Sequence, residues 1–155
     1  MENQLAARIA TAFPPGAPPV EVVSLLAREL HAHAADIENA LDGQAWQEVP
    51  TDVLEDQAKN ILALSPEAFA YYLPAFLRAA LREPGGDSAT YAMYALSPLG
   101  NLENYAQTTC TLFSPDQAGV IVEFLNILME DPSFAPLAHE LPSAIDLWQR
   151  RASAL

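Results

Sequence analysis

Several residue types are scarce in this chain of 155 residues, and each scarcity excludes a class of protein. The single cysteine, Cys110, excludes an intramolecular disulfide framework and a zinc site built from cysteines. Seven Lys and Arg residues stand against twenty Asp and Glu residues, which gives a net charge of −13. Because so acidic a chain repels phosphate groups, we expect no nucleic-acid partner.

Long apolar runs are also missing. The longest candidate, residues 68–77, is about half the length needed to cross a bilayer. The chain begins with Met-Glu-Asn-Gln, and Arg8 interrupts its only early apolar stretch, which is unlike a secretory signal. We therefore expect a cytoplasmic protein that has no membrane partner.

Apolar side chains are plentiful. They make up 51% of the residues, which is enough for one hydrophobic core. Residues 5–13 carry Leu5, Ile9 and Phe13 at the spacing of a short amphipathic helix. The prolines of residues 13–19 then impose an extended connector. We predict that residues 1–18 form this helix and connector, free to pack loosely or onto a partner, and that residues 19–155 form one helical domain.

Apolar spacings of three and four predict further helices. One long helix is expected over residues 20–41, with Pro19 in its first turn and Gly43 at its stop. Asp52 and Glu55 are spaced as a capping box at the start of the next helix.

Two later helix starts are clearer. Ser65-Pro66-Glu67 and Ser114-Pro115-Asp116-Gln117 each combine a hydroxyl cap, a proline and an acid in the first turn. The helices that follow, residues 68–82 and 118–130, are apolar almost all round and should form the centre of the domain. Pro74 predicts a kink in the first of them, with a tyrosine hydroxyl reaching the carbonyl that it frees.

Three smaller features complete the predicted fold. Residues 108–113 have β-branched character and are the only strand candidate. Residues 143–152 predict a last helix, and Arg78 and Arg82 mark one exposed stripe of the central helix. The predicted fold class is mainly all-α: a compact domain of about six to eight helices with at most one short hairpin or strand.

The motifs of known catalytic and metal chemistry do not occur. The chain has no Gly-x-Ser-x-Gly elbow, phosphate loop, His-Glu-x-x-His or dinucleotide fingerprint. His31 and His33 are two apart, so a helix would point them in opposite directions, and His139 stands alone. The sequence neighbours of Cys110 offer no cation or base to lower its pKa, which favours a buried structural thiol. We expect no catalytic residue, no metal and no cofactor, and a non-enzyme is favoured.

The distribution of charge is the most informative pattern. No basic residue lies between Arg28 and Lys59, where there are eight acids, nor between Arg82 and Arg150, where there are nine. Acidity that only keeps the protein soluble is one reading. The other is a negative surface that attracts a basic protein. Its predicted residues are Asp36, Glu38, Asp42, Glu48, Asp52, Glu55 and Asp56.

Two alternatives stay open beside a binding surface. A small enzyme or ligand-binding protein would have its pocket near Trp46, Tyr71 and Tyr72, lined by Asp42 or Glu48, although such aromatic residues are more often part of a core. A helical homo-oligomer of structural role would cover the apolar residues that one core cannot.

One stretch of the chain resembles a known family. The order is an acidic segment, then Ala45-Trp46-Gln47-Glu48-Val49-Pro50, then a helix with Tyr71-Tyr72-Leu73-Pro74-Ala75-Phe76-Leu77. It resembles a family of short bacterial proteins known only as a domain of unknown function. The resemblance covers residues 36–82 well and 112–128 loosely, and it implies a mostly helical, cytoplasmic, bacterial protein without supplying an activity.

The leading hypothesis from the sequence is therefore a non-catalytic module that binds a basic protein through its acidic surface. An immunity-type inhibitor of a bacterial toxin fits this description, because toxins that act on nucleic acid carry basic clefts that an acidic protein can block.

Overall fold

Helices make up nearly all of the structure. The computed structural model describes residues 2–13, 16–23, 29, 32–83, 85–98, 105–132 and 140–153. Its helices are α1 (Glu2–Ala12), α3 (Ala34–Leu41), the 3-10 helix η1 (Trp46–Glu48), α4 (Thr51–Gln57), the 3-10 helix η2 (Ala58–Ala63), α5 (Pro66–Arg82), α6 (Asp87–Leu96), α7 (Tyr105–Cys110), α8 (Pro115–Glu130) and α9 (Leu141–Ala152). These ranges hold no strand, only an isolated bridge between Val23 and Leu64. The predicted all-α class is confirmed.

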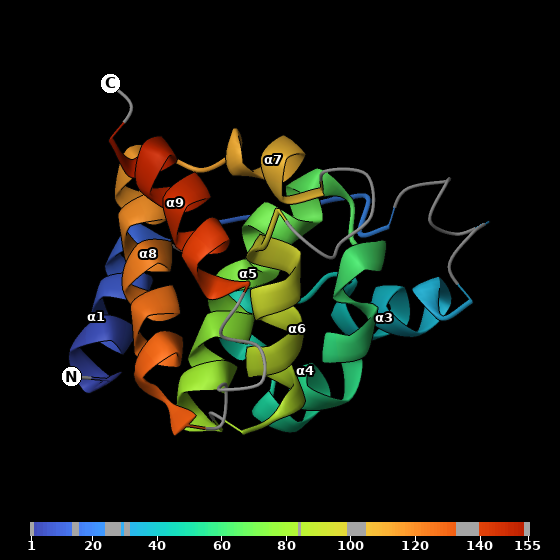
Figure 1. The fold of residues 1–155 in the computed structure, drawn as a ribbon. Coiled ribbons are helices and arrows are strands. Elements are labelled where there is room, and N and C mark those ends of the chain that lie inside the picture. The colour runs from blue at the N-terminus through green and yellow to red at the C-terminus, as the bar shows by residue number, and fades with distance from the viewer. Residues whose placement is uncertain are drawn as a thin grey trace.

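Helix α5 lies at the centre, with α6 against it, α1, α8 and α9 on one side and α3 and α4 on the other (Figure 1). Ten of its seventeen residues are buried, including Pro74 in its middle, and the helix continues through that proline. Helix α8 buries one apolar face against α1 and α9. None of the described helices is long and apolar enough to cross a membrane.

Both clear helix starts are confirmed. The Ser65 hydroxyl accepts a hydrogen bond from the backbone N–H of Ala68 at 3.1 Å. At the start of α8, Ser114 accepts from the Gln117 N–H at 3.1 Å, while the Gln117 side chain accepts from the Ser114 N–H at 3.0 Å. Each cap pairs an N–H that the first helical turn leaves without a partner.

The first helix packs tightly on its own chain. Leu5, Ile9 and Phe13 are buried in the same core as the rest of the protein. The Phe13 ring lies edge-on to Phe113 at 6.2 Å, and the Gln117 amide donates to Ala12 O at 3.0 Å. The expectation of a loosely packed first dozen residues is therefore wrong for α1.

The single helix predicted over residues 20–41 is also wrong. Residues 20–23 are not helical, residues 32 and 33 form a turn, and α3 begins only at Ala34; residues 24–28, 30 and 31 lie outside the described part. The cause is Ser65, whose N–H and hydroxyl donate to Val22 O and Glu21 O, both at 2.9 Å, and hold this segment beside the start of α5. Gly43, with φ of +74°, follows α3 as predicted.

The strand predicted over residues 108–113 does not form. Residues 105–110 are helix α7, followed by a turn. The Thr109 hydroxyl donates to Tyr105 O at 2.9 Å, one turn back. A buried threonine hydroxyl thus finds its hydrogen-bond partner within the helix itself. Burial of Thr109 and Cys110 then outweighs their β preference. The last helix forms where predicted, beginning two residues earlier at Leu141.

Candidate functional site

The predicted acidic residues lie on α3, η1, α4 and the turns between them. Helix α3 packs on α4, both pack on η2, and η1 packs on α5. We call Asp36, Glu38, Asp42, Glu48, Asp52, Glu55 and Asp56 the acidic surface. Five of them are exposed, whereas Glu38 and Glu55 are half-buried. The fold therefore places most of these carboxylates in solvent on elements that pack together.

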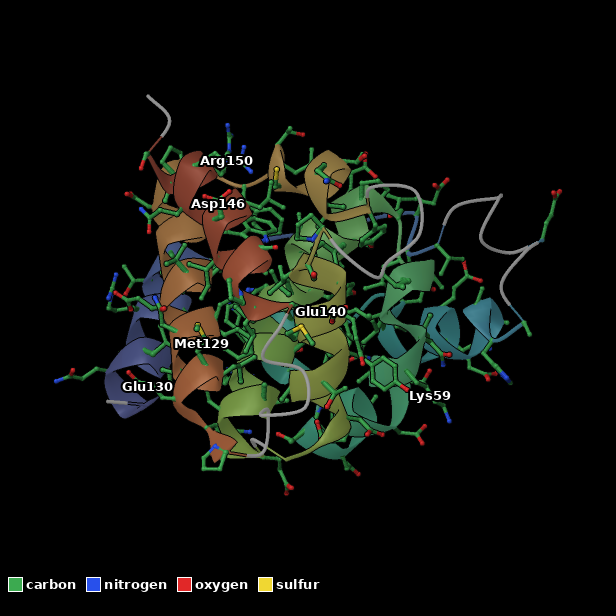
Figure 2. The ribbon with its side chains drawn as sticks, in the orientation of Figure 1. Lys59, Met129, Glu130, Glu140, Asp146 and Arg150 are labelled. Atoms are coloured by element: carbon green, nitrogen blue, oxygen red, sulfur yellow. The ribbon has the colours of Figure 1, made fainter. Side chains whose placement is uncertain are left out.

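Few partners neutralise this charge. His33 Nδ1 lies 3.1 Å from an Asp36 carboxylate oxygen. Lys59, on η2, is the only Lys or Arg between residues 29 and 77 of the sequence, and Figure 2 shows its side chain on the same side of the molecule as α3. No ion pair with another described residue reaches the exposed carboxylates of Asp42, Glu48 and Asp52. These three carboxylates therefore have no direct ion pair with a described residue, although Arg78 and Arg82 bond the neighbouring Gln47 O and Thr51 hydroxyl.

Glu55 has a structural task instead. One oxygen of its carboxylate accepts a hydrogen bond at 2.9 Å from the N–H of Ser88 in the first turn of α6. The other lies where a Cβ on Gly86 would stand, so this glycine makes room for it. Helix α6 has no side-chain cap from its own N-cap residue, so Glu55 caps it from α4. The capping box predicted from Asp52 and Glu55 is wrong, since α4 begins at Thr51 without a side-chain cap.

Replacing Glu55 with alanine should therefore cost about 1 kcal/mol in free energy of unfolding, through the lost cap and its charge at the positive end of α6. Urea denaturation would measure it. Asp56→Ala is the matched control, because the Asp56 carboxylate is exposed and, among the described residues, bonds only the neighbouring Gln57 side chain, at 2.9 Å. Equal losses in the two variants would contradict the cap.

Tyr72 holds the turn that carries Asp42. Its side chain is fully buried, and its hydroxyl lies 2.7 Å from Leu41 O and 2.8 Å from Gln44 O. Burial raises the pKa of Tyr72 above its usual range, and the charges of Tyr71 and Asp42 add to the effect. The Tyr72 hydroxyl therefore bonds the carbonyls at the end of α3. The prediction that a tyrosine hydroxyl reaches the carbonyl freed by Pro74 is wrong for Tyr72.

Trp46 is held between an arginine and a tyrosine. The Arg78 guanidinium lies 5.1 Å from the centre of its ring and donates to Gln47 O at 3.0 Å. The Tyr71 hydroxyl accepts a hydrogen bond from the backbone N–H of Trp46 at 3.3 Å, and the Tyr71 ring packs edge-on against Tyr72, with ring centres 4.8 Å apart. Burial, and then the charge of Arg82, lower the pKa of Arg78.

These contacts correct one prediction and leave another open. Arg82 is exposed as expected, but Arg78 is half-buried against Trp46. Sequence patterns did not indicate this stack, because its partners are far apart in the chain. The pocket predicted near Trp46, Tyr71 and Tyr72 stays a prediction. The buried Trp46 Nε1 has no hydrogen-bond partner among the described residues, and a bound ligand could accept from it.

Of the three histidines, only His33 lies in the part of the chain that the structure describes. His31 and His139 lie outside the described residues, and His33 is exposed. The described residues contain no group of three His, Cys, Asp or Glu side chains that could hold a metal ion. Burial raises the pKa of Cys110, although Arg151 and Arg150 on α9 oppose the shift, so the thiol stays protonated near neutral pH.

Comparison with known proteins gives one match. The model of a family of unknown function, DUF6714, matches residues 2–152. Neither the curated proteins nor the solved structures contain a match. The resemblance seen in the sequence, to a family without a known activity, is confirmed.

Proposed function

We propose that this chain, which belongs to the DUF6714 family of unknown function, is a non-catalytic protein-binding module whose acidic surface binds a basic protein partner. The observation that carries the proposal is the set of exposed carboxylates at Asp42, Glu48 and Asp52, which have no ion pair with a described residue. A net charge of −13 adds a long-range field of the same sign.

The setting of these carboxylates supports binding. Asp42 lies in the turn that Tyr72 holds, and Glu48 belongs to η1, which begins at the buried Trp46. Backbone held by a core loses little conformational freedom on association, so more of the interaction energy appears as affinity. Complementary charge then speeds encounter and selects against acidic partners.

The role of this class that fits best is an immunity-type inhibitor of a bacterial toxin, acting in the cytoplasm. An enzyme that cleaves nucleic acid needs a basic cleft for phosphate. An acidic protein can occupy such a cleft without any chemistry of its own.

The test is capture of a partner by the tagged full chain from lysate of the native host, repeated over a series of salt concentrations. We expect a basic protein to be captured, and we expect its capture to weaken as the salt concentration rises. In the triple variant Asp42→Asn, Glu48→Gln and Asp52→Asn, association with that protein should slow by about 10-fold or more at low salt. The matched control removes three exposed charges elsewhere, by Glu67→Gln, Glu83→Gln and Asp116→Asn.

Three results would argue against the proposal: no protein is captured, capture does not depend on salt, or the control slows association as much as the triple variant.

A further inference from the structure

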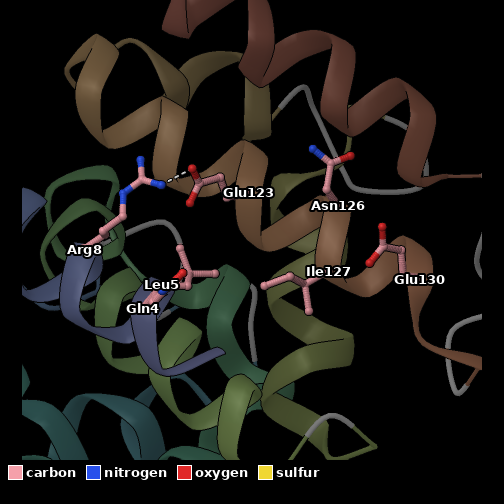
Figure 3. Close-up of a pocket in the computed structure, with 7 residues that line it drawn as sticks. All are labelled: Gln4, Leu5, Arg8, Glu123, Asn126, Ile127 and Glu130. Atoms are coloured by element: carbon pink, nitrogen blue, oxygen red, sulfur yellow. Dashed lines mark hydrogen bonds and ion pairs between the residues drawn. The ribbon is translucent and has the colours of Figure 1, made fainter. Parts of the chain in front are cut away.

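A groove of about 300 Å³ lies between α1 and α8, away from the acidic surface. Figure 3 shows α1 contributing Gln4, Leu5 and Arg8 and α8 contributing the remaining side chains. Leu5 is buried and Ile127 half-buried, so the groove has an apolar floor. Gln4, Asn126 and Glu130 are exposed at its rim. Such a space holds one long side chain and little more.

The charge in this groove is unbalanced. Arg8 and Glu123 form an ion pair across it, so their charges cancel. Glu130 is the last residue of α8 and forms no ion pair or hydrogen bond with a described residue. It stands at the negative end of the helix dipole, and the last turn of α8 contains no basic residue. Figure 2 shows Glu130 at this end of α8. A cation placed here would meet both the carboxylate and the dipole.

We infer that the groove binds a basic side chain, Lys or Arg, of a protein partner. The aliphatic stem would lie on Leu5 and Ile127, and the charged head would reach the Glu130 carboxylate, with the side-chain carbonyl of Asn126 as a further acceptor. A neutral apolar occupant would gain nothing from the carboxylate and the dipole, and an anion would be repelled. The inference is independent of the proposed function, because α3 and α4 lie on the other side of α5.

The test is a titration of the isotope-labelled full chain in which the NMR signals of its backbone amides are recorded at each step. The probes are Nα-acetyl-lysine methylamide and Nα-acetyl-arginine methylamide, with the norleucine analogue as a probe that has the stem but no charge. We expect the two charged probes to shift the amide signals of Gln4, Asn126 and Glu130, and the norleucine probe to leave them unchanged.

Two variants move the affinity in opposite directions. Glu130→Gln should weaken binding of the lysine probe roughly two- to five-fold, which is the range for an exposed ion pair. Arg8→Gln frees Glu123, adds a second unpaired carboxylate and should tighten binding by a similar factor. Glu67→Gln, far from the groove, is the matched control for loss of one charge and should change nothing.

The inference is overturned if the norleucine probe shifts the same signals, if the shifts fall outside the groove, or if Glu130→Gln and Arg8→Gln change the affinity no more than Glu67→Gln does. The triple variant of the acidic surface should bind the lysine probe like the unchanged chain, so this result and that of the proposed function are read separately.

Discussion

Replacing Trp148 with alanine is expected to lower the free energy of unfolding by roughly 3–5 kcal/mol. The indole is fully buried, its centre lies 5.2 Å from that of Phe113, and its N–H donates to Leu96 O at 2.8 Å. The variant would leave a cavity among the helices and a buried carbonyl without a donor. For a chain of this size the melting temperature should fall by roughly 6–20 °C, as calorimetry would show.

Two further variants separate the causes. Trp148→Phe keeps most of the buried ring but removes the donor to Leu96 O, and it should cost roughly 1–3 kcal/mol. Met129→Ala is the control for loss of a large apolar side chain, because Met129 is 47% exposed, and it should stay within about 0.5 kcal/mol of the unchanged chain. A loss below about 1 kcal/mol for Trp148→Ala would contradict the packing of α9.

The elements that could be predicted from the sequence are those that a few adjacent residues determine. The hydroxyls of Ser65 and Ser114 each accept a hydrogen bond from the backbone N–H three residues later and so cap a helix. The two central helices therefore begin where the sequence indicates. The non-helical residues 20–23 are held instead by Ser65, which lies more than forty positions later. No local pattern contains that information, and the apolar spacing alone favoured a helix.

The same distinction applies to the candidate sites. The acidic surface could be predicted because its residues are close in the sequence and charge is visible there. Its geometry could not: that Glu55 caps α6 follows from a contact 33 positions away. The groove between α1 and α8 left no signal at all, since the partners Arg8 and Glu123 are separated by 115 positions.

Raising the pH above about 9 is expected to destabilise the fold steeply. Burial raises the pKa of Cys110, Tyr72 and Tyr105 in the folded protein. Below the unfolded pKa of each group, both states hold the proton and the contribution to stability is complete. Above it, the unfolded chain releases the proton while the folded protein retains it, so stability falls until the pH passes the folded pKa. The two tyrosines together remove up to about 2.7 kcal/mol per pH unit above about pH 10.

Urea denaturation between about pH 8 and about pH 11 would measure this slope, with the fluorescence of the buried Trp46 and Trp148 as the signal of unfolding. Tyr72→Phe should lower stability at neutral pH, because Leu41 O and Gln44 O lose their donor, yet it should roughly halve the alkaline slope. Tyr91→Phe removes a tyrosine that is only half-buried and serves as the control. A slope unchanged in Tyr72→Phe, or reduced as much in Tyr91→Phe, would show that the buried hydroxyl does not cause the alkaline loss. Since that hydroxyl also holds the turn that carries Asp42, the loss of stability in Tyr72→Phe measures how firmly the core supports this part of the acidic surface.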